Sequence, residues 1–280
     1  MRVFEGRKIV LLSKHKKEIA IKSLLESETG CQLIVESSFD TDQLGTFTRD
    51  IDRRMSQLET AREKNKICLE LTDFDMAISS EGSFDINPLF QMPWNIEIVL
   101  LHDKKENYEV FGIFKGPETN LDHTITSKWT DAVKFAEKIG FPDHYIILRP
   151  GGENGKPIYK DIDSFAKFED AFIKCKKKSL ARKVFIETDM RAHANPTRMK
   201  NIMLATQDLV NKLNNLCPNC GAYGFVVTDV IKGLRCELCG LPSDLVLKYV
   251  YSCYKCKHNE EVIHPYGEFA SPKYCYNCNP

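Results

Sequence analysis

The sequence has no long hydrophobic run and no excess of charge of either sign. No apolar stretch approaches the ~20 residues that a membrane-spanning helix needs, so we expect no membrane segment. The 39 Lys and Arg residues balance the 39 Asp and Glu residues. The chain also lacks low-complexity linkers, and it begins without the apolar core of a signal peptide. These absences favour a globular protein of the cytoplasm with no membrane partner.

Cysteine, by contrast, is present in a regular pattern. Eight of the 11 cysteines form four Cys-x-x-Cys pairs, here called knuckles: Cys217/Cys220, Cys236/Cys239, Cys253/Cys256 and Cys275/Cys278. The gaps between successive knuckles are 15, 13 and 18 residues. A tight turn presents each knuckle to one metal ion, and two knuckles at such a spacing supply the four thiolates of a structural zinc site. The sequence therefore predicts two zinc ions per chain, each in a closed site of four cysteines.

Other uses of these cysteines are less consistent with the sequence. Disulfides are disfavoured because three further scattered cysteines, Cys31, Cys68 and Cys175, suit a reduced compartment. An iron–sulfur cluster would need the same number of ligands, but the hairpin-like spacing favours zinc. Sequential pairing, in which the first knuckle joins the second and the third joins the fourth, is the simpler topology. A crossed pairing is compatible with the same spacing.

The charge of the cysteine-rich segment bears on its partners. Residues 217–280 contain six Lys or Arg and six Asp or Glu residues, and each zinc with four thiolates adds a formal charge of −2. The metal-bound segment is therefore net negative, whereas binding to phosphate backbones needs the opposite sign. Nucleic acid is a possible partner that this charge does not favour. We expect a stapled module that packs on its own chain or on a partner.

The first 215 residues alternate between short apolar runs and helical periodicity. The predicted strands are Lys8–Leu12, Cys31–Glu36, Met76–Ser79, Ile96–His102, Tyr108–Phe114, Tyr145–Leu148 and Val184–Glu187. The predicted helices end near Leu25 or span Met55–Leu71, Trp129–Ile139 (capped by Thr126 or Ser127) and Pro196–Leu213. This alternation, with one inserted hairpin, predicts an α/β fold in which a mixed sheet is flanked by helices. We expect an α/β domain over residues 1–215 and a tandem zinc-ribbon domain over residues 216–280.

Polar segments follow several of these strands, where ligands bind in open α/β sheets. They are Ser13–Glu18, Phe39–Thr48, Ser79–Phe84 and Glu187–Arg198. The lysines of the first segment suit either an anion at a helix N-terminus or a solvated helix start. Glu81 ends a buried strand, so its carboxylate must be solvated, paired or bound to metal. Arg198 falls in the first helical turn, where a guanidinium and free N–H groups can hold a phosphate or carboxylate.

Two resemblances to known families add to these patterns. The motifs D-T-D-x-x-G-T-F-T, L-E-T-A-R-x-K, S-E-G-S-F and E-T-D-M-R-A-H-x-N-P-T-R-M, followed by the knuckles, are similar to those of a bacterial family of unknown function. That resemblance covers most of the chain and implies no activity. In their order along the chain, four segments also resemble the inosine triphosphate pyrophosphatase superfamily: Ser13–Glu18, Glu59–Asn65, Ser80–Phe84 and Pro196–Arg198. Members of that superfamily cut noncanonical nucleoside triphosphates to monophosphates.

This second resemblance implies roles for particular residues. Glu59 and Lys64 stand where the superfamily has a metal-binding Glu and a phosphate-binding Lys, and Glu81 stands where it has paired aspartates. The reduction to one carboxylate is a departure for which Asp75 or Asp189 could compensate. The candidate catalytic residues are Glu59, Lys64, Glu81 and Asp189. The candidate substrate-binding residues are Ser13, His15, Lys17, Thr46, Arg191, His193 and Arg198.

The resulting hypothesis is a Mg²⁺-dependent nucleotide-processing hydrolase, similar to a nucleoside triphosphate pyrophosphatase, with structural zinc ribbons. The alternatives are a noncatalytic nucleotide-binding protein and an adaptor whose ribbons bind a protein or nucleic-acid partner. If a nucleotide binds, the Ser13–Lys17 turn, Lys64, Arg191 and Arg198 should meet in one cleft, because several cations are needed to neutralise a triphosphate. Glu59 and Glu81 should then face a metal at its floor.

Overall fold

The computed structural model describes residues 2–45, 55–87 and 91–280. The chain divides into two compact units, each described by itself below. The α/β unit comprises Phe4–Leu209, and the cysteine unit comprises Val210–Pro280 together with the first residues of the chain. The division therefore falls within the last predicted helix, six residues before the boundary expected from the sequence.

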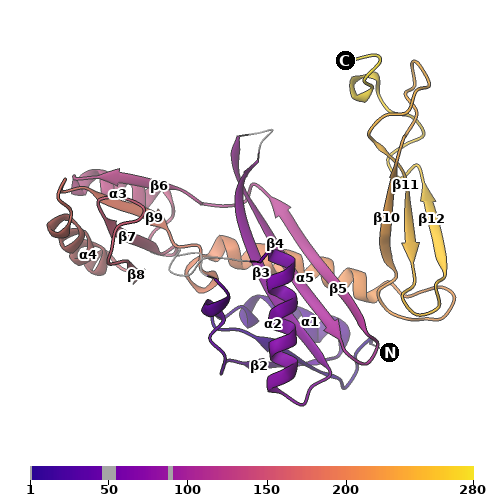
Figure 1. Cartoon of the computed structure of the whole chain (residues 1–280), viewed down its shortest axis with the longest axis horizontal. Helices are drawn as coiled ribbons and strands as arrows, with labels where there is room; N and C mark the ends of the chain where they lie inside the picture. The colour runs from indigo at the N-terminus through magenta and orange to yellow at the C-terminus, as the bar shows by residue number, and fades with distance from the viewer. Residues whose placement is uncertain (1, 46–54, 88–90) are drawn as a thin grey trace. The chain divides into compact units, whose positions relative to one another are not determined.

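A mixed five-stranded sheet is the framework of the α/β unit (Figure 1). Its order is β2-β1-β3-β4-β5, with bounds β1 Lys8–Leu12, β2 Gln32–Glu36, β3 Met76–Asn87, β4 Met92–Asp103 and β5 Tyr108–Gly116. Strands β1, β2 and β3 run parallel, whereas β3, β4 and β5 are antiparallel neighbours. β1 is buried over Ile9–Leu12, as its continuous apolar run predicts. β3 runs past the end of β1, so among the described strands β4 alone pairs with its second half.

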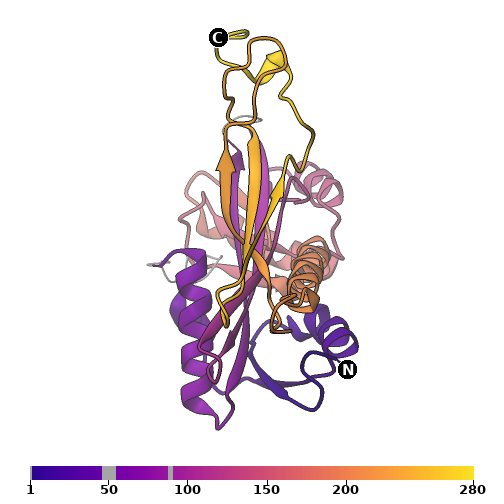
Figure 2. The same cartoon turned by 90° about the vertical axis from the view of Figure 1, so that its right-hand side faces the viewer.

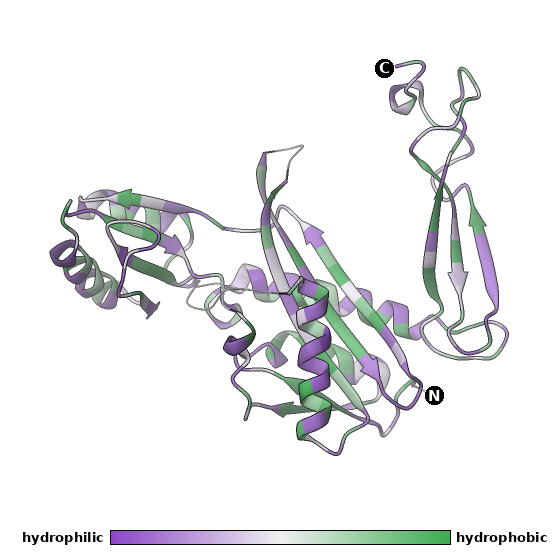
Figure 3. Cartoon of the chain, in the orientation of Figure 1, coloured by the Kyte–Doolittle hydropathy of each residue, from purple (hydrophilic) through white to green (hydrophobic). Residues whose placement is uncertain are grey.

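Helices cover both faces of this sheet. Figure 2 shows α2 on one face and α1 with α5 on the other. The bounds are α1 Glu18–Thr29, α2 Gln57–Leu71 and α5 Pro196–Asn214, with the short helix η1 at Thr41–Leu44. The strands between them are largely hydrophobic, whereas the outward side of α2 is mainly hydrophilic (Figure 3). Asn195 caps α5 as predicted, because its Oδ1 accepts from the Arg198 N–H at 3.0 Å.

A second sheet lies in the same unit, so the prediction of one mixed sheet is only partly right. Its order is β6-β9-β7-β8, with every neighbouring pair antiparallel. The elements are β6 His123–Thr126, α3 Trp129–Lys138, β7 Ile146–Pro150, β8 Tyr159–Ile162, α4 Phe165–Lys178, β9 Val184–Thr188 and η2 Ala192–Ala194. Residues of α3, α4 and the strands β7, β8 and β9 share one core around Phe168 and Ile186. The predicted cap of α3 is wrong, because Lys128 holds the N-cap position and its own side chain makes no capping bond; the Thr126 hydroxyl accepts instead from the Lys128 N–H at 3.0 Å.

The cysteine unit is built on a three-stranded antiparallel sheet in the order β10-β11-β12. Its elements are β10 Val226–Lys232, β11 Val246–Ser252, β12 Asn259–Ile263 and the short helix η3 Pro272–Tyr274. None of these strands was predicted, and every residue of β12 is exposed. In the described part of the whole chain, no helix combines the length and apolar content needed to cross a membrane.

Candidate metal centres and a buried charge cluster

The eight knuckle cysteines gather into two groups of four. Site 1 consists of Cys217, Cys220, Cys253 and Cys256, and site 2 consists of Cys236, Cys239, Cys275 and Cys278. In site 1 the Sγ atoms of Cys217 and Cys256 are 3.7 Å apart, and those of Cys220 and Cys253 are 3.6 Å apart. The matching Sγ distances in site 2 are 3.9 and 3.5 Å. A tetrahedron with sulfurs about 2.3 Å from a central zinc has edges of about 3.8 Å, whereas a disulfide is about 2.05 Å long.

The pairing is crossed, so the simpler sequential pairing is wrong. The first knuckle joins the third in site 1, and the second joins the fourth in site 2. One strand separates each knuckle from the next: β10, then β11, then β12. Because these strands are antiparallel neighbours, the chain reverses direction after each one and alternate knuckles arrive at the same end of the sheet. Two four-cysteine groups, each with sulfur spacings that fit a tetrahedral metal ion such as zinc, therefore lie at opposite ends of one small sheet.

In the α/β unit, three predicted residues meet on one side of β3. Lys64 of α2 forms a close ion pair with Glu81 of β3, and both side chains are nearly inaccessible to solvent. Lys17 lies at the start of α1 and donates from its ammonium group to the backbone carbonyl of Ser80. This Lys17 side chain reaches the part of β3 that β1 leaves without a neighbour. The Lys17 side chain and the pair of Lys64 and Glu81 are therefore buried close to the same part of β3.

Arg198 lies on the opposite face of the same sheet. Strand alternation puts Ser79, Glu81 and Ser83 toward α2, since the Ser79 hydroxyl donates to the Ala61 carbonyl of that helix. Gly82 then faces the other way, and a Cβ on Gly82 would come within 2.5 Å of Nη2 of Arg198. The predicted single cleft that would hold both Glu81 and Arg198 is therefore not what the structure shows. Lys17 lies at the edge of β3, where the charged residues of both faces, Glu81 on one and Arg198 on the other, affect its pKa.

Arg198 has a structural partner that sequence analysis missed. Its Nε donates to Oε1 of Glu97 on β4 at 2.8 Å, and its Nη1 donates to the Met190 carbonyl at 2.6 Å. Glu97 is fully buried, and Asn95 also donates to it at 3.1 Å. One signal for this partner was present in the sequence: Glu97 is the single acid within the apolar run Ile96–Leu101.

Glu59 has a different role from the one that the resemblance implies. It is exposed, and its carboxylate accepts from the backbone N–H of Ser56 at 2.8 Å, while the Ser56 hydroxyl accepts from the Glu59 N–H at 3.3 Å. These reciprocal bonds are a capping box at the start of α2, and they lower the pKa of Glu59. We therefore assign Glu59 to helix capping and no longer to a metal at the floor of a cleft.

The capping role can be measured with two substitutions. Ser56→Ala should lower the free energy of unfolding by about 1 kcal/mol, because a backbone N–H at the helix start loses its acceptor. Glu59→Gln should change it by less than about 0.5 kcal/mol, because glutamine also completes a capping box. Both Trp residues, Trp94 and Trp129, lie in the α/β unit, so tryptophan fluorescence during denaturation reports this unit alone. If Glu59→Gln lost magnesium-dependent release of pyrophosphate from a nucleotide at unchanged stability, Glu59 would be a metal ligand after all.

The predicted histidines are in contact with each other. The rings of His15 and His193 are stacked, with centroids 5.1 Å apart, and His15 Nε2 is 2.9 Å from Oδ1 of Asp42. Burial lowers the pKa of His15 to about 4, against the opposing effect of Asp42, and burial also lowers the pKa of His193. Both rings are thus neutral at pH 7. Ser13 supports the adjacent helix start, since its hydroxyl accepts from the Lys17 N–H at 3.2 Å.

The remaining candidate residues form ion pairs or lie outside the residues that the structure describes. Arg191 donates to both carboxylate oxygens of the fully buried Asp189 and to Asp161. Burial acts to lower the pKa of Arg191, but these carboxylates outweigh it and the pKa is raised. Asp75 pairs with Arg7 and Lys105. Thr46 falls outside the described residues. Among those that are described, the two cysteine sites are the only groups of three or more candidate metal ligands.

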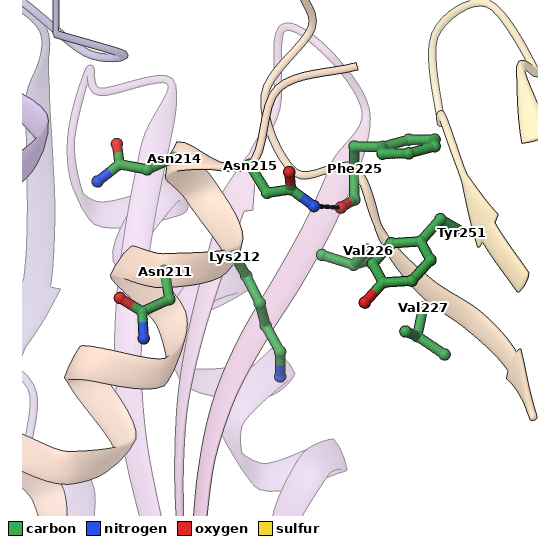
Figure 4. Close-up of a pocket in the computed structure, with 8 residues that line it drawn as sticks. All are labelled: Asn211, Lys212, Asn214, Asn215, Phe225, Val226, Val227 and Tyr251. Carbon is green, nitrogen blue, oxygen red and sulfur yellow. Dashed lines mark hydrogen bonds between the residues drawn. The ribbon is translucent and has the colours of Figure 1, made fainter. Parts of the chain in front are cut away.

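A pocket of about 650 Å³ lies in the cysteine unit between the end of α5 and the sheet (Figure 4). Asn211, Lys212 and Asn214 form one wall, and Val226 and Tyr251 belong to the facing wall. The walls are tied together because Asn215 Nδ2 donates to the Phe225 carbonyl at 2.5 Å and the Phe225 N–H donates back at 2.9 Å. No candidate residue from the sequence lines this pocket.

Comparison with known proteins places the chain in a family. No curated protein matches it. Residues 64–280 match the family model described as a domain of unknown function, DUF6671, and this range includes both metal sites, Lys64, Glu81 and Arg198. The match covers most of the chain, and it agrees with the resemblance to a bacterial family whose motifs end in cysteine knuckles. The chain is therefore a member of the DUF6671 family.

Proposed function

We propose that the α/β unit binds a phosphorylated small molecule, a nucleotide, beside Lys17 at the open edge of β3. The balance of buried charge supports this proposal. Near the second half of β3, three of the buried cations, Lys17, Lys64 and Arg198, stand against two of the buried carboxylates, Glu81 and Glu97. Lys64 pairs with Glu81 and Arg198 pairs with Glu97, so Lys17 is left with a carbonyl partner and no carboxylate within ion-pair distance among the described residues. An anion that reaches Lys17 would supply the missing charge.

The protonation state of Lys17 is consistent with such a role. Its pKa is lowered to about 7, mainly by burial and also by the neighbouring cations Lys64 and Arg198, against the opposing effect of Glu81 and Glu97. Near pH 7 the amine is therefore only partly protonated in the ligand-free protein. A bound phosphate would favour the ammonium form, so binding should take up a proton.

Hydrolysis with Mg²⁺ is a second candidate, favoured by the contact between Lys64 and Glu81. These are the residues to which the resemblance gives a phosphate-binding and a metal-binding role. Glu81 alone is a weak magnesium site, but Mg²⁺ commonly binds through one or two carboxylates plus the phosphates of its substrate. Under this hypothesis the phosphates of the nucleotide supply the other Mg²⁺ ligands. Lys64 then leaves Glu81 and pairs with a phosphate oxygen.

The two candidates are separated by one set of measurements. The zinc-loaded chain is incubated with a panel of nucleoside triphosphates, with and without Mg²⁺, and thermal stability and released pyrophosphate are both recorded. Stabilisation by nucleotide without release supports the binding protein, and magnesium-dependent release supports the hydrolase. No stabilisation and no release with any nucleotide would contradict both, and nucleic acid that stays bound through purification would point to an adaptor.

Lys17→Met tests the anion site. We expect the variant to lose nucleotide binding and the proton uptake that calorimetry in buffers of different ionisation enthalpy detects at pH 8. Lys16→Met, which removes an exposed neighbouring lysine, is the matched control and should retain both. If Lys17→Met binds nucleotide as tightly as the parent, the ligand does not bind at the edge of β3.

The same variant should be more stable than the parent without ligand. Folding lowers the pKa of Lys17 from 10.5 to about 7, so the unfolded chain binds more protons between those pH values. Lys17 therefore lowers the free energy of unfolding. This destabilisation is largest below pH 7 and disappears as the pH rises toward 10.5. Lys17→Met should gain on the order of a few kcal/mol at pH 7, and the gain should shrink at higher pH. Denaturation followed by tryptophan fluorescence measures this difference.

A further inference from the structure

Large apolar side chains are exposed around site 2. Five of them are between 48% and 73% exposed: Leu238, Leu241, Phe269, Tyr274 and Tyr276. Leu238 and Tyr276 lie inside the two knuckles of this site, and Tyr274 directly precedes one of them. Phe269 is next to Ala270, whose backbone bridges to Cys236. Several exposed apolar side chains around one site are typical of an interaction surface.

Site 1 shows this property less, although Leu216, directly before Cys217, is 49% exposed. Its Cys217 and Cys253 form a small core with Phe225, and Ala222 and Tyr251 pack against it. Phe225, Ala222 and Tyr251 therefore cover that metal site. Those near site 2 remain exposed, which distinguishes the two ends of the sheet.

A pocket lies beside this apolar surface. It has a volume of about 400 Å³, and its apolar lining comes from Pro242, Leu247 and Phe269. Arg235, His264 and Glu268 supply its polar groups. A pocket of this size accepts one large side chain, and a single buried anchor of that kind often dominates the affinity of an interface.

The charge around site 2 restricts the partner. Residues 233–247 and 264–280 contain the carboxylates Glu237, Asp244 and Glu268 and the cations Arg235 and Lys273. A zinc ion with four thiolates adds a formal charge of −2, which brings this end to −3. Residues 217–228 and 251–259, around site 1, contain two lysines and no carboxylate. The apolar surface therefore coincides with the more negative end of the unit, which repels nucleic acid and favours a positively charged partner.

We propose that the site 2 end of the cysteine unit is a docking surface for a positively charged protein segment that carries one large apolar side chain. That side chain enters the pocket beside Phe269, and flanking Lys or Arg residues face the carboxylates and the thiolate-bound zinc. The zinc at site 2 holds both knuckles in place and so presents Leu238 and Tyr276. This interaction is independent of the nucleotide site in the α/β unit.

The probe is a fluorescent peptide with the sequence of residues 177–183 of this chain, Lys-Lys-Ser-Leu-Ala-Arg-Lys, which has four cations around one leucine. Binding to the full zinc-loaded chain is followed by fluorescence anisotropy at low and high salt. We expect saturable binding that weakens with salt. Phe269→Asp and Glu268→Lys should each weaken it at least about tenfold. Leu71→Asp, which changes an exposed apolar residue of α2, should leave it unchanged.

Each variant must retain two zinc ions, so that loss of binding is not loss of folding. A peptide with Asp in place of its leucine should bind at least about tenfold more weakly, and so should a peptide with Gln in place of its cations. Equal binding of the Asp peptide would reduce the interaction to charge alone and overturn the proposal. Binding that is insensitive to Phe269→Asp and Glu268→Lys, or no binding at all, would also overturn it.

Discussion

Replacing Cys217 and Cys253 together with serine should leave a chain that binds one zinc ion. Both residues belong to site 1, so site 2 keeps its four thiolates. Replacing Cys217 and Cys236 together should leave no complete site, because the two substitutions then fall in different sites. Sequential pairing would give the reverse result for the two double variants. Metal analysis of the purified proteins therefore distinguishes the two pairings directly.

The effect on folding should be large as well. A structural zinc site of this kind is worth roughly 10–16 kcal/mol of folding free energy, and the described strands of the cysteine unit have little apolar core to replace it. The Cys217/Cys236 double variant should lose the β-structure of the cysteine unit, whereas tryptophan fluorescence should show an intact α/β unit. A cysteine unit that stays folded without metal would contradict the structural role of zinc.

The number of cysteines in each site could be predicted from the sequence, whereas the pairing of the knuckles could not. Four knuckles with near-regular spacing predict two four-cysteine sites because ligand number and geometry are local properties. The pairing depends instead on how many strands separate the knuckles. Each gap of 13 to 18 residues has room for one strand, and the runs at Val226–Lys232 and Val246–Ser252 are rich in β-branched and aromatic residues. Recognising those strands would have favoured the crossed pairing.

The candidate site shows a similar limit. The sequence predicts one cleft for the Ser13–Lys17 turn, Lys64, Arg191 and Arg198, because several cations are needed to neutralise a triphosphate. Of the residues expected there, Lys17, Lys64 and Glu81 lie together in the structure. The sequence also predicts the helix start at Arg198, but the partner of that residue comes from β4, about a hundred positions earlier. Which face of the sheet each residue occupies depends on the register of β3 against β4, and motif order alone carries no information about register.

Arg198→Met should destabilise the α/β unit by about 3–5 kcal/mol. The side chains of Arg198 and Glu97 are 2% and 0% exposed, so the substitution leaves a buried carboxylate without its cation. This expectation differs from the one drawn from the sequence, in which Arg198 bound a ligand. Denaturation followed by tryptophan fluorescence gives the free energy. The exposed pair of Lys174 and Asp170 provides the control, because Lys174→Met should cost less than about 1 kcal/mol.

A double-mutant cycle separates the ion pair from the packing of the arginine. Glu97→Gln keeps an oxygen that can accept from Asn95 and removes the charge that Arg198 neutralises. Combined with Arg198→Met, it should recover much of the lost stability, because replacing both members of a buried pair costs far less than removing one. If the double variant is no more stable than Arg198→Met, the contact with the Met190 carbonyl and packing on Phe84 account for the loss. If Arg198→Met is as stable as the parent but no longer binds nucleotide, Arg198 belongs to the ligand site after all.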